Sequence, residues 1–293
     1  MSIKTIIIGK GHLGTILAKA FDPRSSLWIN KEAPRFMHWT DDLSKLDTRV
    51  LAGFQPDYVI NAAGKTDLPW CEANKDECWR CNVIEPVMLQ RRLPKHATLI
   101  HLSSGCVWTG PFRDDGQPFE PMDAPTPACF YAWTKVASDA QLMMEAENDL
   151  RQIFILRPRQ VFSPADSPRN TLSKLLSYKR LIDTPNSMTS SDLIAEVIRK
   201  IIYPVVPRAR ERRIMNVYNS GITSPFLVGR MLAKAGLREE PELMLKSELD
   251  DFHKPRRVDV VMFDQYFNDY FEERPVDRAL ESAINEYAKN LKP

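Results

Sequence analysis

A glycine turn between an apolar strand and a helix is the feature that most restricts how this chain can fold. The short apolar run Ile3–Ile8 leads directly into Gly9-Lys10-Gly11-His12-Leu13-Gly14. Glycine permits the tight turn, and its missing side chain lets a pyrophosphate approach the backbone at the start of the next helix. The turn therefore predicts a dinucleotide site, whose cofactor-binding residues are Gly9, Gly11, His12, Leu13 and Gly14.

The first half of the chain alternates short apolar runs with amphipathic stretches, the pattern of βαβ units. It predicts an α/β fold: a Rossmann-type doubly wound parallel sheet, joined by a smaller C-terminal substrate-binding lobe. The expected strands are Ile3–Ile8, Leu27–Ile29, Tyr58–Gly64 (ending in a turn), Thr98–Leu102, Ile153–Leu156 and Ile214–Tyr218. The expected helices are Leu13–Phe21, Trp70–Leu93, Tyr131–Asn148 and Ser191–Ile202, with a mostly helical segment from Ser224.

The composition and pattern of the sequence change after Arg157, and this change predicts the domain boundaries. The chain has 293 residues, 43% of them hydrophobic, enough for one large domain and a smaller lobe. We expect residues 1–157 to form the NAD(P)-binding domain, with a segment of about 186–220 returning to it. Residues 158–185 and 221–293 form the expected substrate-binding lobe.

Charge and hydropathy narrow the class of protein. Lys and Arg number 40 against 38 Asp and Glu, a net charge of +2, which argues against general nucleic-acid binding. No apolar run is long enough to cross a bilayer, and the N-terminus enters a strand without a signal core. We therefore expect a cytoplasmic protein with neither a nucleic-acid nor a membrane partner.

The five cysteines allow two interpretations. Cys78 and Cys81 have metal-ligand spacing, and Cys71 precedes them by two helical turns, but a second such pair is missing. Packed helix thiols are the favoured interpretation over structural zinc, and no metal site is expected.

A tyrosine and a lysine four residues apart suggest a proton donor. Tyr131 and Lys135 share one face of the helix expected there, and Ser104 follows an expected strand. An ammonium beside a phenol stabilises the phenolate, which makes proton exchange feasible near neutral pH. Alone, such a pair is usually a surface pair. Together with Ser104 and the glycine turn, it predicts a catalytic trio in which Ser104 also holds the substrate oxygen and Tyr131 and Lys135 also contact the cofactor.

Cofactor choice is determined at the end of the second strand of such a fold. The expected strand end carries Asn30 and Lys31 and no carboxylate, which favours NADPH and leaves NADH as the alternative. Lys31 and nearby Arg35 can equally be loop charges. The remaining cofactor contacts are Asp42 and Leu43, expected beside the adenine, and the small residues Ala62, Ala63 and Gly64.

The chain resembles the extended short-chain dehydrogenase/reductases, in particular the dTDP-4-dehydrorhamnose reductase-like enzymes and the bifunctional nucleotide-sugar 3,5-epimerase/4-reductases. Nearly the whole chain fits. The glycine turn departs from this pattern, because many extended members have GxxGxxG and this chain has GxGxxG. The stretches that carry the resemblance are Asn61–Gly64, Trp70–Glu72, Asn82-Val83, Ser104–Trp108, Pro168–Asn170, Ser173-Lys174, Pro185–Thr189, Asn216–Gly221 and Pro255-Arg256.

The resemblance implies a second pair of catalytic residues. In the bifunctional enzymes a cysteine at the position of Cys106 moves protons beside the ketone, and Lys174 matches its lysine partner. Protons next to a carbonyl are acidic because the enolate oxygen carries the charge. The alternatives are a small buried hydrophobe at Cys106 and an exposed helix residue at Lys174.

A nucleoside diphosphate requires positive groups in the smaller lobe. Guanidinium groups bind phosphate oxygens well, and amides contact sugar or base. The candidates are Arg169, Asn170, Asn186 and Arg256, besides Ser104. Each arginine can equally be a surface charge.

Together these features predict an NADPH-dependent enzyme that reduces C4 of a UDP- or dTDP-linked 4-keto-6-deoxyhexose after epimerising C3 and C5. One alternative is a reductase or epimerase acting on another nucleotide sugar. Another is a non-catalytic regulatory subunit that binds a dinucleotide. The resemblance also allows a homodimer, because many relatives pair through helices.

Overall fold

The structure is a computed structural model that describes residues 3–22, 35–39, 43–149, 152–203, 214–252 and 254–291. It divides into two compact units. Unit 1 consists of 1–104, 129–157 and 195–215, and unit 2 consists of 105–128, 158–194 and 216–293. The segment 105–128 thus packs with unit 2, whereas the sequence analysis placed it in the first domain. Which segments serve the cofactor and which the substrate remains a prediction.

A six-stranded sheet with the order β2-β1-β3-β4-β5-β9 forms the centre of unit 1, and its last strand, β9, continues into unit 2 after Met215. Strand β1 pairs in parallel with β2 on one side and with β3 on the other. The chain therefore switches direction across the sheet at β1, and ligands of open α/β sheets bind at such a point. The strands are β1 (Lys4–Ile8), β2 (Arg35–Trp39), β3 (Tyr58–Asn61), β4 (Thr98–Leu102), β5 (Ile153–Pro158) and β9 (Ile214–Val217).

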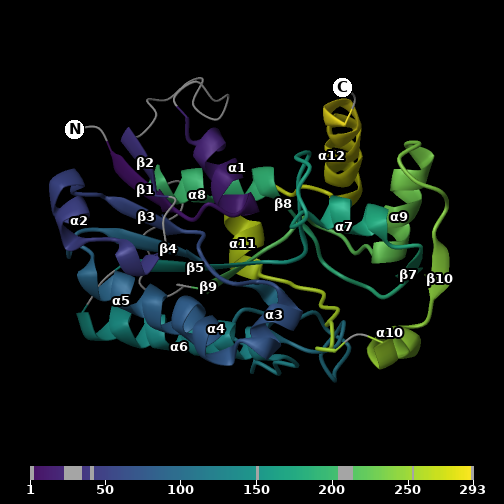
Figure 1. Ribbon diagram of the computed structural model, residues 1–293, viewed down its shortest axis with the longest axis horizontal. Helices are drawn as coiled ribbons and strands as arrows, with labels where there is room; N and C mark the ends of the chain where they lie inside the picture. The colour runs from purple at the N-terminus through teal and green to yellow at the C-terminus, as the bar shows by residue number, and fades with distance from the viewer. Residues whose placement is uncertain are drawn as a thin grey trace. The chain divides into compact units, whose positions relative to one another are not determined.

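Helices cover both faces of this sheet, as Figure 1 shows with α1 on one side and α3–α6 on the other. Each of the strands β3, β4 and β5 is buried along its whole length, which explains why their residues are mostly apolar. The helical segments are α1 (His12–Ala20), η2 (Leu43–Lys45), α2 (Thr48–Phe54), α3 (Leu68–Ala73), α4 (Lys75–Trp79), η3 (Arg80–Ile84), α5 (Glu85–Arg92), α6 (Phe130–Asp149) and α8 (Ser191–Ile202), which enters unit 1 at Ala195.

Unit 2 has its own apolar core, in which helices α7, α9 and α12 contribute Leu172, Val228 and Leu280. Two short parallel pairs, β6 with β8 and β7 with β10, complete it. Its strands are β6 (Val161–Phe162), β7 (Arg180–Ile182), β8 (Thr189–Ser190) and β10 (Glu242–Met244). Its helices are η4 (Gly105–Val107), α7 (Thr171–Ser177), α9 (Pro225–Lys234), α10 (Lys246–Phe252), α11 (Gln265–Tyr270) and α12 (Val276–Asn290).

The predicted Rossmann-type α/β fold is confirmed, and most predicted elements agree with the structure to within a few residues. The predicted helix Trp70–Leu93 is wrong as a single element: α3 ends at Ala73, and a second helical run begins at Lys75. Asn74 lies at the C-cap of α3 and at the N-cap of α4. Asparagine is favoured at such positions, because its short side chain competes for backbone hydrogen bonds.

The strand beside β1 lies later in the chain than predicted. The predicted strand Leu27–Ile29 is outside the described residues, and the strand that pairs with β1 is Arg35–Trp39. Arg35 and His38 interrupt its apolar pattern, and none of its residues is fully buried. A half-exposed strand of this kind gives a weak signal in sequence.

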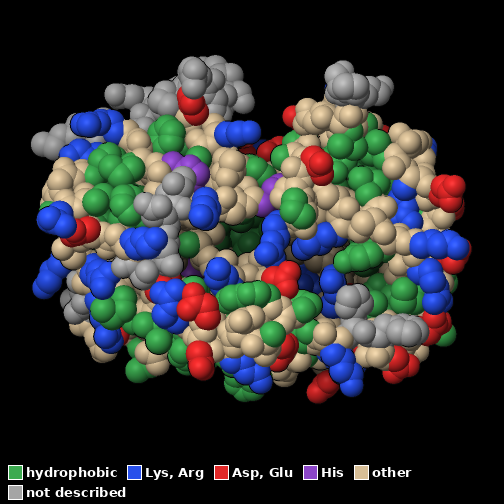
Figure 2. Space-filling view, in the orientation of Figure 1, with side chains coloured by type: hydrophobic (Ala, Val, Ile, Leu, Met, Phe, Trp, Pro, Cys, Tyr) green, Lys and Arg blue, Asp and Glu red, His purple; other side chains and the backbone are tan. Residues whose placement is uncertain are grey.

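Surface charge is mixed. Figure 2 shows basic and acidic side chains on the visible parts of both units. Among the described residues, no helix is both long enough and apolar enough to span a bilayer.

Candidate active site

The glycine turn lies at the carboxyl end of β1 and packs tightly on itself. Gly9 has a φ of 121°, and a Cβ on Gly14 would lie 2.2 Å from the carbonyl oxygen of Gly9. Gly9 N donates to the carbonyl oxygen of Trp39 at 3.0 Å, and His38 Nε2 donates to the carbonyl oxygen of Gly9 at 2.7 Å. Gly9 and Gly14 are therefore required by the fold itself.

Gly11 differs from the other two glycines. Gly11 is the N-cap residue of α1, so no side chain caps this helix N-terminus. A Cβ on Gly11 would meet no atom within 4 Å among the described residues. Its φ of −71° is open to any residue. The free space and the uncapped helix N-terminus fit the pyrophosphate of a dinucleotide.

Replacing Gly11 with Ala separates folding from cofactor binding. We expect Gly11→Ala to change the unfolding free energy by less than about 0.5 kcal/mol, since the added methyl meets no neighbour. The same methyl occupies space that a bound pyrophosphate requires, so the Kd for NADPH should rise about tenfold or more, a loss of roughly 1.4 kcal/mol. Thermal unfolding and fluorescence titration measure the two effects, and unchanged affinity would place the pyrophosphate elsewhere.

Small residues follow β3 and adjoin the same end of the sheet. Ala62 and Ala63 are half-buried, and Gly64 is exposed with a φ of 156°. Asn82, on a π-helical turn, is 1% exposed and ties this loop to helix α6. Its Oδ1 accepts from Lys65 N at 2.8 Å, and its Nδ2 donates to Thr134 Oγ1 at 3.0 Å. The sequence analysis gave Asn82 no role in the site, because a π turn leaves no clear pattern in sequence.

The predicted catalytic trio lies within unit 1. Ser104, Tyr131 and Lys135 are all buried, at 8%, 6% and 3% exposure. Lys135 Nζ donates to the carbonyl oxygen of Leu102 at 3.1 Å, so this face of α6 reaches the carboxyl end of β4, two residues before Ser104. The structure thus places Lys135 at the strand end that precedes Ser104. The catalytic role of the three residues remains a prediction.

A buried histidine beside the trio is neutral. His101 is fully buried in β4, and its Nδ1 lies 3.2 Å from Asn61 Nδ2. Burial, and then the positive charge of Lys135, hold the pKa of His101 well below its usual value. The imidazole therefore adds no positive charge next to the lysine.

The residues predicted to select the cofactor are only partly described. Asn30, Lys31 and Asp42 lie outside the described residues. Because the strand beside β1 ends at Trp39, the strand end lies later than the sequence analysis placed it, and Asp41 and Asp42 follow it in sequence. The argument for NADPH from Asn30 and Lys31 therefore loses its structural basis.

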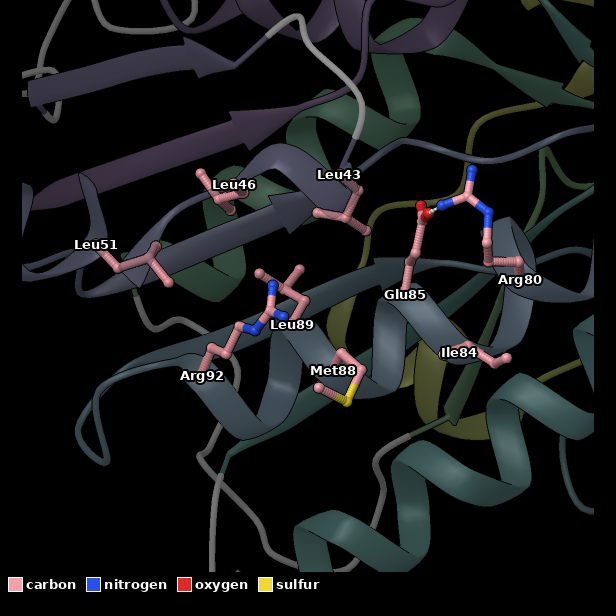
Figure 3. A pocket seen from close by; sticks show the side chains of 9 residues that line it. All are labelled: Leu43, Leu46, Leu51, Arg80, Ile84, Glu85, Met88, Leu89 and Arg92. Carbon is pink, nitrogen blue, oxygen red and sulfur yellow. Dashed lines mark hydrogen bonds and ion pairs between the residues drawn. The ribbon is translucent and has the colours of Figure 1, made fainter. Parts of the chain in front are cut away.

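Leu43, the other predicted adenine contact, lines a pocket of about 190 Å³ in unit 1. Figure 3 shows Leu43 and Leu46 above helix α5, and an ion pair between Arg80 and Glu85 at one end. Met88 and the other lining leucines are apolar. The pocket is lined mostly by apolar side chains, with Arg80, Glu85 and Arg92 as its charged residues, and the predicted adenine contact at Leu43 remains a prediction.

The cysteines predicted as packed thiols are Cys71, Cys78 and Cys81, and all three are buried. Burial is the main cause that raises the pKa of Cys81 to about 12, and burial also raises the pKa of Cys71. Both sulfurs therefore stay protonated in the fold.

Cys106 and Lys174, the second predicted pair, both belong to unit 2. Cys106 is half-buried in η4, and Lys174 is half-buried on α7. The side chain of Arg159 contacts the cysteine, with Nη1 2.9 Å from Sγ. Arg159 was missed in the sequence analysis, because a contact between positions 53 residues apart has no local signal.

The four predicted substrate residues fall into two groups. Arg169 and Arg256 are exposed, and Arg256 Nε donates to Asp250 Oδ2 at 3.2 Å. Asn170 and Asn186 are fully buried. Asn170 caps α7 and donates to the carbonyl oxygens of Ser163 and Ala165, so it shapes the loop beside it. Asn186 bonds to other buried side chains. Direct contact of any of the four with substrate remains a prediction.

A parallel sheet with a glycine turn at its switch point has the architecture of dinucleotide-binding α/β proteins. The family model described as RmlD substrate binding domain matches residues 3–248. The chain belongs to this family.

Two curated relatives come from Arabidopsis thaliana. One, a trifunctional UDP-glucose 4,6-dehydratase/UDP-4-keto-6-deoxy-D-glucose 3,5-epimerase/UDP-4-keto-L-rhamnose-reductase, is 28% identical over 240 residues, 78% of this chain and 32% of that protein. The other, a bifunctional dTDP-4-dehydrorhamnose 3,5-epimerase/dTDP-4-dehydrorhamnose reductase, is 31% identical over 186 residues, 59% of this chain and 56% of that protein. The chain thus spans about a third to just over a half of the length of these relatives.

Solved structures share the fold over nearly the whole chain. The UDP-rhamnose synthase of Acanthamoeba polyphaga mimivirus superposes with a TM-score of 0.82 at 19% identity, covering 98% of this chain and 100% of that one. The dTDP-4-dehydrorhamnose reductase of Bacillus anthracis, solved in complex with NADP, gives 0.78 at 16% identity, covering 99% and 100%. At these identities the likeness establishes the fold.

Proposed function

We propose that this protein reduces C4 of a nucleotide-linked 4-keto-6-deoxyhexose with NADPH. The observation that carries the proposal is the hydrogen bond from Lys135 Nζ to the Leu102 carbonyl, because it brings the tyrosine–lysine face of α6 to the strand end that leads to Ser104. Family membership supports the substrate class, and the relatives are named for rhamnose-type sugar nucleotides linked to UDP or dTDP.

The residues fit a reductase mechanism. The glycine turn and Ala62–Gly64 would hold NADPH, which would supply a hydride when bound. Ser104 donates a hydrogen bond to the ketone oxygen and orients it. Tyr131 gives a proton to that oxygen as it becomes an alcohol, and the Lys135 ammonium stabilises the phenolate that remains. Burial of all three keeps competing water away from the proton transfer.

We propose further that Cys106 and Lys174 epimerise C3 and C5 before reduction. One group removes the proton next to the ketone, and the other returns a proton to the opposite face. The oxygen of the intermediate enolate is stabilised by Ser104 and Tyr131. The names of the Arabidopsis relatives, which join a 3,5-epimerase to a reductase, support this step.

NADPH is preferred over NADH in this proposal because the neighbour named as a dTDP-4-dehydrorhamnose reductase was solved with NADP, while the neighbour MoeE5 was solved with NAD. The cytoplasmic location and the homodimer expected from the sequence remain predictions. UDP and dTDP remain alternative carriers of the sugar.

Cys106→Ser tests the two steps separately. We expect proton exchange at C3 and C5 in D₂O to fall about 10²- to 10³-fold, because a hydroxyl is a much weaker acid and base than a thiol at this task. Reduction of a substrate that already has the epimerised configuration should continue. NMR of UDP- and dTDP-4-keto-6-deoxyglucose gives the exchange, and NADPH absorbance gives the reduction. The native protein consuming no NADPH with either substrate would contradict the proposed reductase.

A further inference from the structure

A buried guanidinium lies against the sulfur of Cys106 in unit 2. Arg159 is 4% exposed, and its Nη1 donates to Cys106 Sγ at 2.9 Å. Its Nε donates to Asn186 Oδ1 at 3.0 Å, and its Nη2 donates to the carbonyl oxygen of Val258. Each nitrogen of the guanidinium group thus has its own partner, and the partner of Nη1 is a side chain that can ionise.

The charge of Arg159 has no carboxylate against it among the described residues. The network reaches a carboxylate through Asn186, whose Nδ2 donates to Asp259 Oδ1 at 2.7 Å. Asp259 itself forms an ion pair with Lys246 Nζ at 3.3 Å. A buried charge without an opposite charge is costly, and buried charges are therefore usually paired. The sulfur of Cys106, once deprotonated, supplies the missing negative charge.

The backbone and Asn186 hold the guanidinium in place. Arg159 N donates to Thr189 Oγ1 at 2.8 Å, and Asn186 Oδ1 also accepts from Val260 N at 3.1 Å. The amide of Asn186, a predicted substrate contact, thus also aligns the arginine. The sulfur therefore faces a cation whose position is determined by the surrounding fold.

We propose that Arg159 is a positioning residue for Cys106: it fixes the sulfur and stabilises its anionic form. The inference rests on the proposed function, in which Cys106 takes a proton next to the ketone. In that step an S–H bond forms, a C–H bond breaks, and its electron pair moves into the enolate. Guanidinium remains protonated throughout the working range of pH, so it favours the sulfur anion that must exist before the step.

Alkylation of the native protein tests the proposal without any substrate. Cys106 is half-buried and the other four cysteines are buried, so iodoacetamide followed by peptide mass spectrometry reports on Cys106 selectively. The rate is measured against pH and divided by its plateau at high pH, which removes the effect of access. An ordinary thiol, with a midpoint near pH 8.5, reaches only about 3% of its plateau at pH 7. We expect Cys106 to exceed that fraction at least fivefold, and a profile equal to that of an ordinary thiol would overturn the proposal.

Variants identify the source of the effect. Arg159→Met should lower the alkylation fraction at pH 7 to that of an ordinary thiol. Arg159→Lys should keep part of the increase in this fraction, because lysine keeps the positive charge but lacks the planar set of guanidinium donors. Arg157→Lys is the matched control: Arg157 is also buried, but it pairs with Asp139 at 2.8 Å, so the profile should not move. An unchanged profile in Arg159→Met refutes the proposal. If Arg159→Met does not fold, the alkylation profiles of the native protein and of Arg159→Lys test the proposal.

Substrate assays separate this proposal from the proposed function. Arg159→Met should lose exchange at C3 and C5 by at least about fivefold at pH 7, a smaller loss than that of Cys106→Ser, because an ordinary thiol is still partly ionised. Both variants should still reduce an epimerised substrate. Normal exchange in Cys106→Ser would contradict the epimerase role, while the alkylation result would still decide whether Arg159 acts on the sulfur.

Discussion

Tyr131→Phe is expected to lower kcat for ketone reduction by about 10³-fold, because proton transfer by a positioned side chain contributes on this order. Phenylalanine keeps the ring of this buried residue, 6% exposed, and removes only the hydroxyl. The affinity for NADPH should therefore change little. Stopped-flow absorbance measures the hydride step, and fluorescence titration measures binding of the cofactor.

Tyr270→Phe is the control for this experiment. Tyr270 is 36% exposed on α11, and its ring contacts Tyr266, a contact that phenylalanine preserves. Its turnover should match that of the native protein. Full activity in Tyr131→Phe would show that another group protonates the oxygen. An inactive native protein that nevertheless binds NADPH would instead favour the non-catalytic alternative.

Gly14→Ala is expected to destabilise the fold by about 3 kcal/mol or more. The new Cβ would lie 2.2 Å from the carbonyl oxygen of Gly9 and 2.9 Å from its carbonyl carbon. Both atoms belong to the backbone of the turn, so the clash is relieved only by moving α1 away from β1. Thermal unfolding should show a fall on the order of 10 °C in Tm.

Gly53→Ala is the matched glycine control. Gly53 lies in helix α2, and a Cβ there meets no atom within 4 Å among the described residues. Alanine should stabilise the helix by roughly 0.5 to 1 kcal/mol, because it restricts the unfolded chain. A Gly14→Ala protein as stable as Gly53→Ala would mean that the turn does not pack as described.

The central strands were predictable because both of their faces are buried. Thr98–Leu102 is mostly apolar for this reason, and its predicted bounds equal those of β4. β2 was not predictable in the same way, since this half-exposed strand mixes Arg35 and His38 with apolar residues. The break between α3 and α4 depends on a single capping residue, Asn74, inside an otherwise helical pattern.

The candidate site was predictable where its residues share one element or follow a strand end. Tyr131 and Lys135 lie four residues apart on α6, and the structure brings them to the end of β4. Arg159 was not predictable, because its contact with Cys106 is created by the fold of unit 2. Asn186 was predicted to contact substrate, which remains a prediction, and its burial was not visible in sequence.

Asn82 has a practical consequence for redesign. The Asn82 amide makes hydrogen bonds to the loop after β3 and to Thr134 on helix α6. Thr134 Oγ1 in turn donates to the carbonyl oxygen of Tyr131 at 2.7 Å. Engineering that reshapes residues 62–65 is therefore expected to affect the backbone of α6 at Tyr131 as well. Libraries that vary this loop and Thr134 together should retain turnover more often than libraries that vary the loop alone.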